Sequence, residues 1–303
     1  GSYSKYFSVN FKDQLDEAKQ LETEPKLRLS PRVGVSHPVS ENSKFYFNYG
    51  HFYSLPQSWD MYRLNKGATS AGIQYIGNPL LDPPRTIAYE LGWELSLWDQ
   101  FLFRAAGYYR DITNQVVDVS YTSADGTVNY NTAENKQYSD IRGVELEIRK
   151  RFGRWITGWI NYNYEISSWG SYGRQNYFQD PRAQRREGLF NPSEQEPQAR
   201  PYARANLQLR TPRSWGPMIG EGFYPLSGIS VNFLYRYKSG QYITFDPLGR
   251  GDIFDNLQWE GYHNFDARFG YNIDFRGSRI RLYADSQNIF NIKHLYQGSF
   301  AGQ

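Results

Sequence analysis

The 303-residue chain contains no cysteine, only 2 methionines and no long apolar run. The absence of cysteine excludes disulfides, thiolate chemistry and cysteine-ligated zinc. No segment approaches the roughly 18 consecutive apolar residues of a membrane-spanning helix, so a helical span is excluded. The net charge of +3 is too small to indicate a nucleic-acid partner.

Aromatic residues are abundant. The chain carries 26 Tyr, 19 Phe and 8 Trp, and such residues favour strands. The mean hydropathy of −0.72 is that of a soluble protein. A transmembrane β-strand, however, needs only about 10 residues of alternating pattern and leaves the average hydropathy low. The composition therefore favours an all-β protein and leaves a membrane location open.

The stretch TIAYELGWELSLW, residues 86–98, shows a pattern that recurs along the chain. Its odd-numbered positions, such as Leu91 and Trp93, are apolar, whereas the positions between them are small or charged, as at Glu90 and Glu94. In a strand, this alternation places an apolar face opposite a polar face. The same test predicts about ten strands. They lie near residues 28–38, 43–54, 86–98, 100–112, 138–152, 154–168, 201–211, 227–241, 262–275 and 279–291.

Short and long connections alternate between these strands. The long ones have roughly 20 to 32 residues, against a usual median of about 4–6. They are 55–85, 113–137, 169–200 and 242–261, whereas 39–42, 99, 153 and 276–278 are short, and 212–226 is a longer Pro/Gly-rich exception. This layout is typical of an outer-membrane barrel, with short periplasmic turns and long extracellular loops. Aromatic residues beside the short turns suit a membrane girdle, namely Trp98, Phe101, Phe152, Trp155 and Phe275.

A soluble β-sandwich or propeller would also alternate, but its strands average about 5–6 residues, whereas these run to about 11–15. The expected fold class is therefore all-β, a transmembrane antiparallel β-barrel. On its polar face, Glu145 with Arg149 and Asp266 with Arg268 are expected to pair across neighbouring strands. Open strand edges cannot be satisfied in hydrocarbon. Residues 1–303 are accordingly expected to be a partial barrel domain, with further strands before and after it.

Several phrases of the sequence carry a family likeness. One is an Asn-Pro-x-Leu-x-Pro step before a strand, formed by Asn78, Pro79, Leu81 and Pro83, and another is Asn-x-Phe-Asn at 288–291. With SDIRGVELEIRKRFG, LYRYKSGQYITFD and LYADSQNIFNIKH, they occur in an order that resembles the barrel half of TonB-dependent outer-membrane receptors. The likeness is to the large receptors that carry a carboxypeptidase-regulatory-like domain before the plug. The first motif departs from the family only at Pro84, where an acidic residue usually follows.

The resemblance implies a location and a function. Such receptors are barrels of about 22 strands around a plug in the outer membrane of Gram-negative bacteria, which would make these roughly strands 12 to 21. They import a bulky, scarce solute with energy from the TonB complex, which acts through the plug. The plug and the final strand are absent from this sequence. The implied surroundings are outer-membrane lipid and lipopolysaccharide, with no cofactor, no nucleic acid and no enzymatic activity.

The long loops are where a solute would be recognised, because aromatic rings stack on sugars or flat chelates and arginines pair with carboxylates. A solvated basic loop tip near lipopolysaccharide explains the arginines of DPRAQRR equally well. The ligand-contacting candidates are Trp59, Tyr62, Arg63, Tyr75, Trp169, Tyr172, Tyr177, Arg182, Arg185, Arg186, Phe254 and Trp259.

Other chemistry has little support in the sequence. The residues His37, His51, His263 and His294 lack metal-ligand spacing, and no nucleophile-elbow, P-loop or zinc motif is present. The tripeptide at 124–126, ADG, predicts a tight hairpin that extends a strand pair beyond the membrane. Two alternatives to transport remain, a docking barrel for a surface lipoprotein or larger assembly and, less favoured, a passive porin. Siderophore, cobalamin, glycan and peptide all remain open as the solute.

Overall fold

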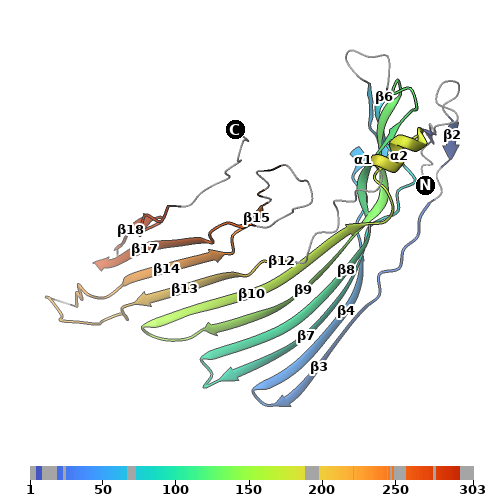
Figure 1. The fold of residues 1–303 in the computed structure, drawn as a ribbon. Coiled ribbons are helices and arrows are strands. Elements are labelled where there is room, and N and C mark those ends of the chain that lie inside the picture. The colour runs from blue at the N-terminus through green and yellow to red at the C-terminus, as the bar shows by residue number, and fades with distance from the viewer. Residues whose placement is uncertain are drawn as a thin grey trace.

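The fold is dominated by one curved antiparallel sheet (Figure 1). The computed structural model describes residues 5–8, 19–22, 25–66, 73–187, 198–220, 222–243, 245, 248, 257–275 and 278–293. Ten strands follow one another as neighbours in chain order, as the alternation predicted. They are β3 (Arg32–Ser40), β4 (Ser43–Tyr53), β7 (Arg85–Leu97), β8 (Phe101–Thr122), β9 (Asn129–Lys150), β10 (Ile156–Ser171), β13 (Tyr202–Arg210), β14 (Ile229–Lys238), β17 (Tyr262–Phe275) and β18 (Ser278–Ser286).

Smaller elements occupy the connections. Two of them are helices, α1 (Ser58–Tyr62) and α2 (Pro181–Glu187). The short strands are β1 (Lys5–Ser8), β2 (Lys19–Glu22), β5 (Leu64–Lys66), β6 (Ile73–Ile76), β11 (Asn176–Phe178), β12 (Gln198–Ala199), β15 (Tyr242–Ile243) and β16 (Leu257–Gln258). Neither helix in the described part of the chain is long and apolar enough to span a membrane.

Residues 113–137 were expected to form a loop, and this prediction is wrong. Strands β8 and β9 continue through it as a 22-residue pair, and their register runs from Phe101 opposite Lys150 to Thr122 opposite Asn129. The alternation is hidden because Asn114 takes a positive φ of 59° and the register shifts on either side of Gln115. The predicted tight hairpin at 124–126 is confirmed, with Gly126 at φ 69° and the Ser123 hydroxyl donating to Asp125 at 2.6 Å.

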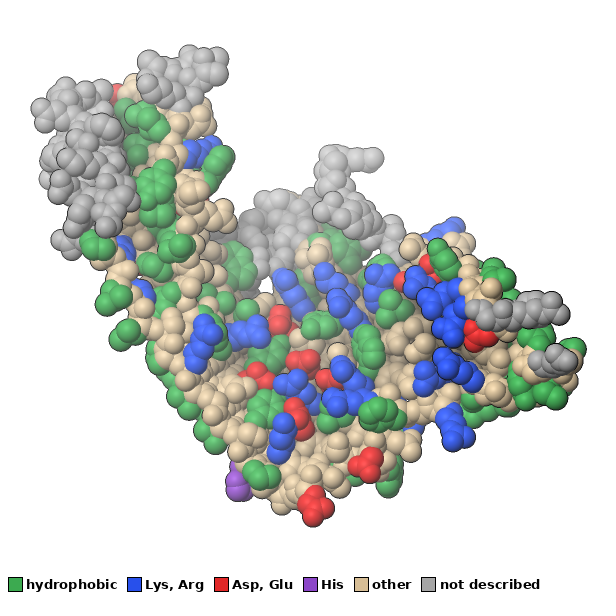
Figure 2. Space-filling model, turned by 180° about the vertical axis from the view of Figure 1, so that it is seen from behind, with side chains coloured by type: hydrophobic (Ala, Val, Ile, Leu, Met, Phe, Trp, Pro, Cys, Tyr) green, Lys and Arg blue, Asp and Glu red, His purple; other side chains and the backbone are tan. Residues whose placement is uncertain are grey.

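The two faces of the sheet differ as expected for a barrel wall. The side chains of the apolar face are not covered by other parts of the described chain; Leu91 is 59% exposed and Ile160 is 53% exposed. On the opposite, concave face, lysine, arginine, aspartate and glutamate side chains gather (Figure 2). Aromatic side chains stand exposed at the short-turn edge, where a girdle was predicted, including Trp98, Phe152 and Trp155. The side chain of Phe275 lies outside the described residues.

The predicted ion pairs on the polar face have different partners. Arg149 pairs with Glu147 of its own strand, and Glu145 is not its partner. Asp266 pairs with Arg236 of β14 at 2.7 Å, whereas Arg268 pairs with Asp285 of β18 at 2.5 Å. Arg268 and Asp285 are opposite in the β17–β18 register, so cross-strand neighbours decide this pair, and spacing along one strand does not.

Candidate functional site

Two long connections attach to the extended β8–β9 hairpin, residues 113–137, which we call the arm. On one edge, β6 pairs in parallel with β9, with Tyr75 opposite Asn131. On the other edge, β11 pairs in parallel with β8, with Tyr177 opposite Tyr121. The segments 55–85 and 169–200 therefore meet on one structure, and α1, β6 and α2 lie together around it in Figure 1. Most of the predicted ligand-contacting residues are gathered there.

Arg63 lies between two aromatic rings on the β9 side of the arm. Its guanidinium carbon is 3.8 Å from the ring centroid of Trp59 and 4.6 Å from that of Tyr75. Tyr75 is only 4% exposed and its hydroxyl donates to Asp118 at 3.1 Å. Burial, reinforced by the charge of Asp118, raises the pKa of Tyr75. Tyr75 is thus part of the support, whereas Trp59 and its neighbour Tyr62 are exposed to a ligand.

A stack of tyrosines forms the β8 side of the arm. Tyr121 stacks on Tyr177 at 5.0 Å and on Tyr130 at 5.3 Å, with interplanar angles of 10° and 14°. The Tyr121 hydroxyl donates to Glu134 at 2.5 Å, and Lys136 donates to the Tyr177 hydroxyl at 2.7 Å. Burial, and then the hydrogen bond to Glu134, raises the pKa of Tyr121, and burial raises the pKa of Tyr130 to about 12. Tyr121 and Tyr130 therefore stay neutral at physiological pH.

The remaining residues of segment 169–200 surround this stack. Trp169 belongs to β10, which continues into the predicted loop, and Tyr172 tilts against Tyr138 with ring centroids 4.6 Å apart. Helix α2 is tied to β11 because the Phe178 amide donates to the Gln184 side chain at 2.8 Å. Arg182, Arg185 and Arg186 are exposed on this helix. These arginines can bind an anion that approaches from the solvent.

Two predicted residues lie elsewhere. Trp259 follows β16, half-buried, with its amide donating to the carbonyl of Gln241 at 2.9 Å. Strands β15 and β16 form a separate two-stranded sheet. Phe254 lies outside the described residues. The loop 242–261 is thus not joined to the arm by any of the pairings just described.

Several residues that support the site were missed. The Asn78 side chain donates to the Ala133 carbonyl of β9 at 3.0 Å, and Asp82 accepts from Lys26 and Arg28 at 2.9 Å each. The hydrogen bond from Lys26 lowers the pKa of Asp82. The Asn-Pro-x-Leu-x-Pro step therefore fastens segment 55–85 to the arm. Its position before a strand could be read from the sequence, but its contact with β9 depends on the tertiary fold.

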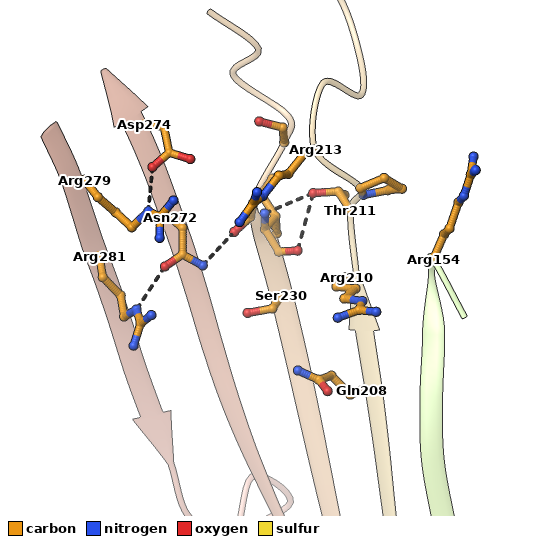
Figure 3. A pocket seen from close by; sticks show the side chains of 14 residues that line it. Arg154, Gln208, Arg210, Thr211, Arg213, Ser230, Asn272, Asp274, Arg279 and Arg281 are labelled. Atoms are coloured by element: carbon orange, nitrogen blue, oxygen red, sulfur yellow. Dashed lines mark hydrogen bonds and ion pairs between the residues drawn. The ribbon is translucent and has the colours of Figure 1, made fainter. Parts of the chain in front are cut away.

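A basic pocket of about 470 Å³ lies at the opposite, short-turn end of the polar face (Figure 3). Arg279 donates to Asp274 at 2.7 Å, and Arg281 donates to Asn272 at 2.9 Å. Asp274 is the one carboxylate that lines the pocket, against the arginines Arg154, Arg210, Arg213, Arg279 and Arg281. Such a set favours anions. Sequence reasoning missed it because the arginines come from separate elements.

Three of the histidines lie on three different strands, His37 on β3, His51 on β4 and His263 on β17. His51 lies 2.5 Å from the Tyr49 hydroxyl and His263 lies 2.9 Å from the Tyr235 hydroxyl. No group of three or more potential metal ligands occurs in the part of the chain that the structure describes. His294 lies outside that part.

Comparison with known proteins identifies the fold. The sequence profile of the family described as "TonB dependent receptor-like, beta-barrel" matches residues 2–289. One similar solved structure is the outer-membrane transporter YddB of Escherichia coli, with a TM-score of 0.59 and 11% identity; the match covers 91% of this chain and 38% of that chain. Another is the FrpB iron transporter of Neisseria meningitidis, with a TM-score of 0.55 and 14% identity; the match covers 91% of this chain and 36% of that chain. The ferric-catecholate import receptor Fiu of E. coli K12 has a TM-score of 0.52 and 17% identity, and the match covers 96% of this chain and 36% of that chain. The chain thus spans less than two-fifths of the length of these structures. No curated protein sequence matches it.

Proposed function

Since the chain belongs to the TonB-dependent receptor-like β-barrel family of the Gram-negative outer membrane, we propose that it forms wall and outer loops of a receptor that takes up a bulky, scarce solute. One observation carries this proposal: two long connections converge on the arm and bring an arginine–aromatic sandwich and a tyrosine stack to one place. Flat rings with a cation between them suit a planar or sugar-like solute that carries negative charge.

Energy for the proposed uptake would come from the TonB complex, which in this family acts through a plug. The lumen wall supplies polar side chains on its concave face (Figure 2). We assign Trp59, Tyr62, Tyr172 and the exposed arginines of α2 to solute contact, and Tyr75 and Tyr177 to the support beneath them. Trp169, Trp259 and Phe254 remain proposed contacts, without support from this cluster.

A depletion experiment tests the proposal. Cells that express the full receptor, with and without functional TonB, are offered ferric siderophores, cobalamin, oligosaccharides and peptides, and the medium is followed by mass spectrometry. We expect one class to be depleted only where TonB works, and Trp59→Ala to reduce that depletion. Equal depletion without TonB would instead indicate a passive porin and contradict the proposal.

A docking role is the second candidate. Exposed aromatics at the arm, with Trp59 57%, Tyr62 56% and Tyr172 57% exposed, resemble the anchors of protein interfaces. If the barrel holds a surface lipoprotein, that protein should co-purify with the receptor in equal amount and be lost in Tyr172→Ala. Stoichiometric co-purification with no solute depletion would favour docking over uptake.

A further inference from the structure

An apolar groove of about 520 Å³ crosses the exposed apolar face of the sheet. Its floor is formed by two small residues on adjacent strands, Gly158 of β10 and Ala205 of β13. Larger side chains stand beside them, including Ile160 and Leu207, 53% and 43% exposed. The groove volume lies within the range of about 300–1,000 Å³ that is usual for small-molecule sites.

The register explains why the face is hollow at this point. Gly158 is paired with Lys150 on one side and with Leu207 on the other, and Ala205 is paired with Ile160. A Cβ atom at Gly158 would overlap the backbone carbonyl oxygen of Asn206, so no larger residue can stand at this position without moving the strand. The backbone thus keeps the groove hollow at Gly158.

One end of the groove carries a cation. Lys150 lines it, and its ammonium nitrogen lies 2.6 Å from Gln100 Oε1 and 4.4 Å from the ring centroid of Phe101. An ammonium group has three donors, so the bond to Gln100 leaves donors for an anion. Trp98 and Phe152 stand exposed near this short-turn edge. Aromatic girdles mark the headgroup level of a membrane.

We propose that this groove binds one acyl chain of a glycerophospholipid whose headgroup phosphate pairs with Lys150. The groove is apolar along its length, it lies on the face that meets hydrocarbon, and its cation lies at the level of the headgroups. A phospholipid has the same arrangement as the groove, with an apolar acyl chain on the hydrocarbon side and a charged phosphate at the headgroup level. The other end is closed by Phe265 and Phe290, whose rings meet edge to face at 5.0 Å.

Native mass spectrometry of the full receptor, extracted from outer membranes in mild detergent, tests the site. Wild-type receptor should retain one more phospholipid than Ala205→Phe, which fills the floor. Ala203→Phe is the matched control, because Ala203 lies on the same strand and face but does not line the groove. It should retain lipid as wild type does. Heat-modifiable mobility in electrophoresis confirms that each variant is folded.

The headgroup is tested by adding vesicles of phosphatidylglycerol or phosphatidylethanolamine. Lys150→Gln should reduce retention of the anionic lipid about fivefold, since one lysine near an anionic surface contributes about 1 kcal/mol. Retention of the zwitterionic lipid, which carries the same phosphate, should fall as well. Equal lipid retention in wild type and Ala205→Phe would disprove binding in the groove, and unchanged retention of both lipids in Lys150→Gln would disprove the role of Lys150.

Discussion

At the scale of single residues, aromatic rings on the arm act both as apolar surface and as partners for charge. Arg63 lies between Trp59 and Tyr75, and this contact fixes α1 against the arm. A cation–π contact that is partly desolvated contributes about 0.5–2 kcal/mol. The position of Arg63 in a long loop was predictable, but its two ring partners depend on the β5–β6 pairing.

Arg63→Ala should therefore loosen segment 55–85. The amides of Gly77 and Asn78 donate to the carbonyls of Arg63 and Asp60 at 2.6 and 2.8 Å, and they report this opening. We expect their hydrogen exchange in the full receptor to accelerate roughly two- to thirtyfold. Arg182→Ala, an exposed change on α2, is the control and should leave both amides unaffected. Unchanged exchange in Arg63→Ala would show that the sandwich does not hold the segment.

The tyrosine stack predicts an alkaline limit for the arm. The pKa of Tyr130 is raised to about 12 by burial, and that of Tyr121 is also raised, whereas an unfolded tyrosine ionises near 10. A raised folded-state pKa gives stability that is complete below pH 10 and is lost as the pH rises from about 10 to 12. Tyrosinate absorbance should show a fraction of tyrosines that ionises near pH 12, and Tyr130→Phe should lower that fraction by one tyrosine. Ionisation of every tyrosine with a midpoint near pH 10 would contradict the buried stack.

At the scale of elements, tyrosines cover glycines of neighbouring strands. Tyr46 is paired with Gly92, Tyr108 with Gly143 and Tyr138 with Gly170. In each pair, a Cβ on the glycine would overlap the tyrosine. Covering a strand glycine with an aromatic ring protects a backbone that has no side chain of its own. These glycines are therefore required by packing.

Gly92→Ala should cost about 1–3 kcal/mol of stability, because it displaces the Tyr46 ring. The Tyr46 hydroxyl also loses its bonds to Glu90 at 2.9 Å and Arg104 at 2.8 Å. Denaturant unfolding of the receptor in lipid measures this cost. Gly107→Ala is the matched control, because the nearest atom to its Cβ is 4.0 Å away. In a Tyr46→Ala background the Gly92→Ala penalty should largely vanish, and its persistence would disprove the coupling.

The strands could be predicted because one face meets an apolar medium and the other does not, which leaves a period of two in the sequence. The extension of β8 and β9 could not be predicted, because Asn114 and the register shifts near Gln115 interrupt that period. The predicted pair of Asp266 with Arg268 was wrong because spacing within a strand does not show which residues lie opposite on the neighbouring strands. Arg268 pairs with Asp285 of β18 because the two residues lie opposite each other in the β17–β18 register.

At the scale of the whole molecule, two of the ten long strands have a partner on one side only among the described residues, β3 and β18. Unpaired backbone groups cost several kcal/mol each in hydrocarbon. Within a membrane, both edges must therefore pair, either with each other or with further strands. A barrel of about 22 strands, of which these are ten, would satisfy them.

The mass of the natural polypeptide decides this point. Receptor extracted from outer membranes should be far heavier than the 35.4 kDa of the 303 residues, because closure needs about as many strands again. Peptide mapping should place those strands, and a plug, on the same chain. The control is heat-modifiable mobility, which shows that the extracted species is a closed barrel. A closed, folded species of 35.4 kDa would mean that β3 and β18 satisfy each other, or those of a second copy, and the proposed uptake through a large plugged barrel would fail.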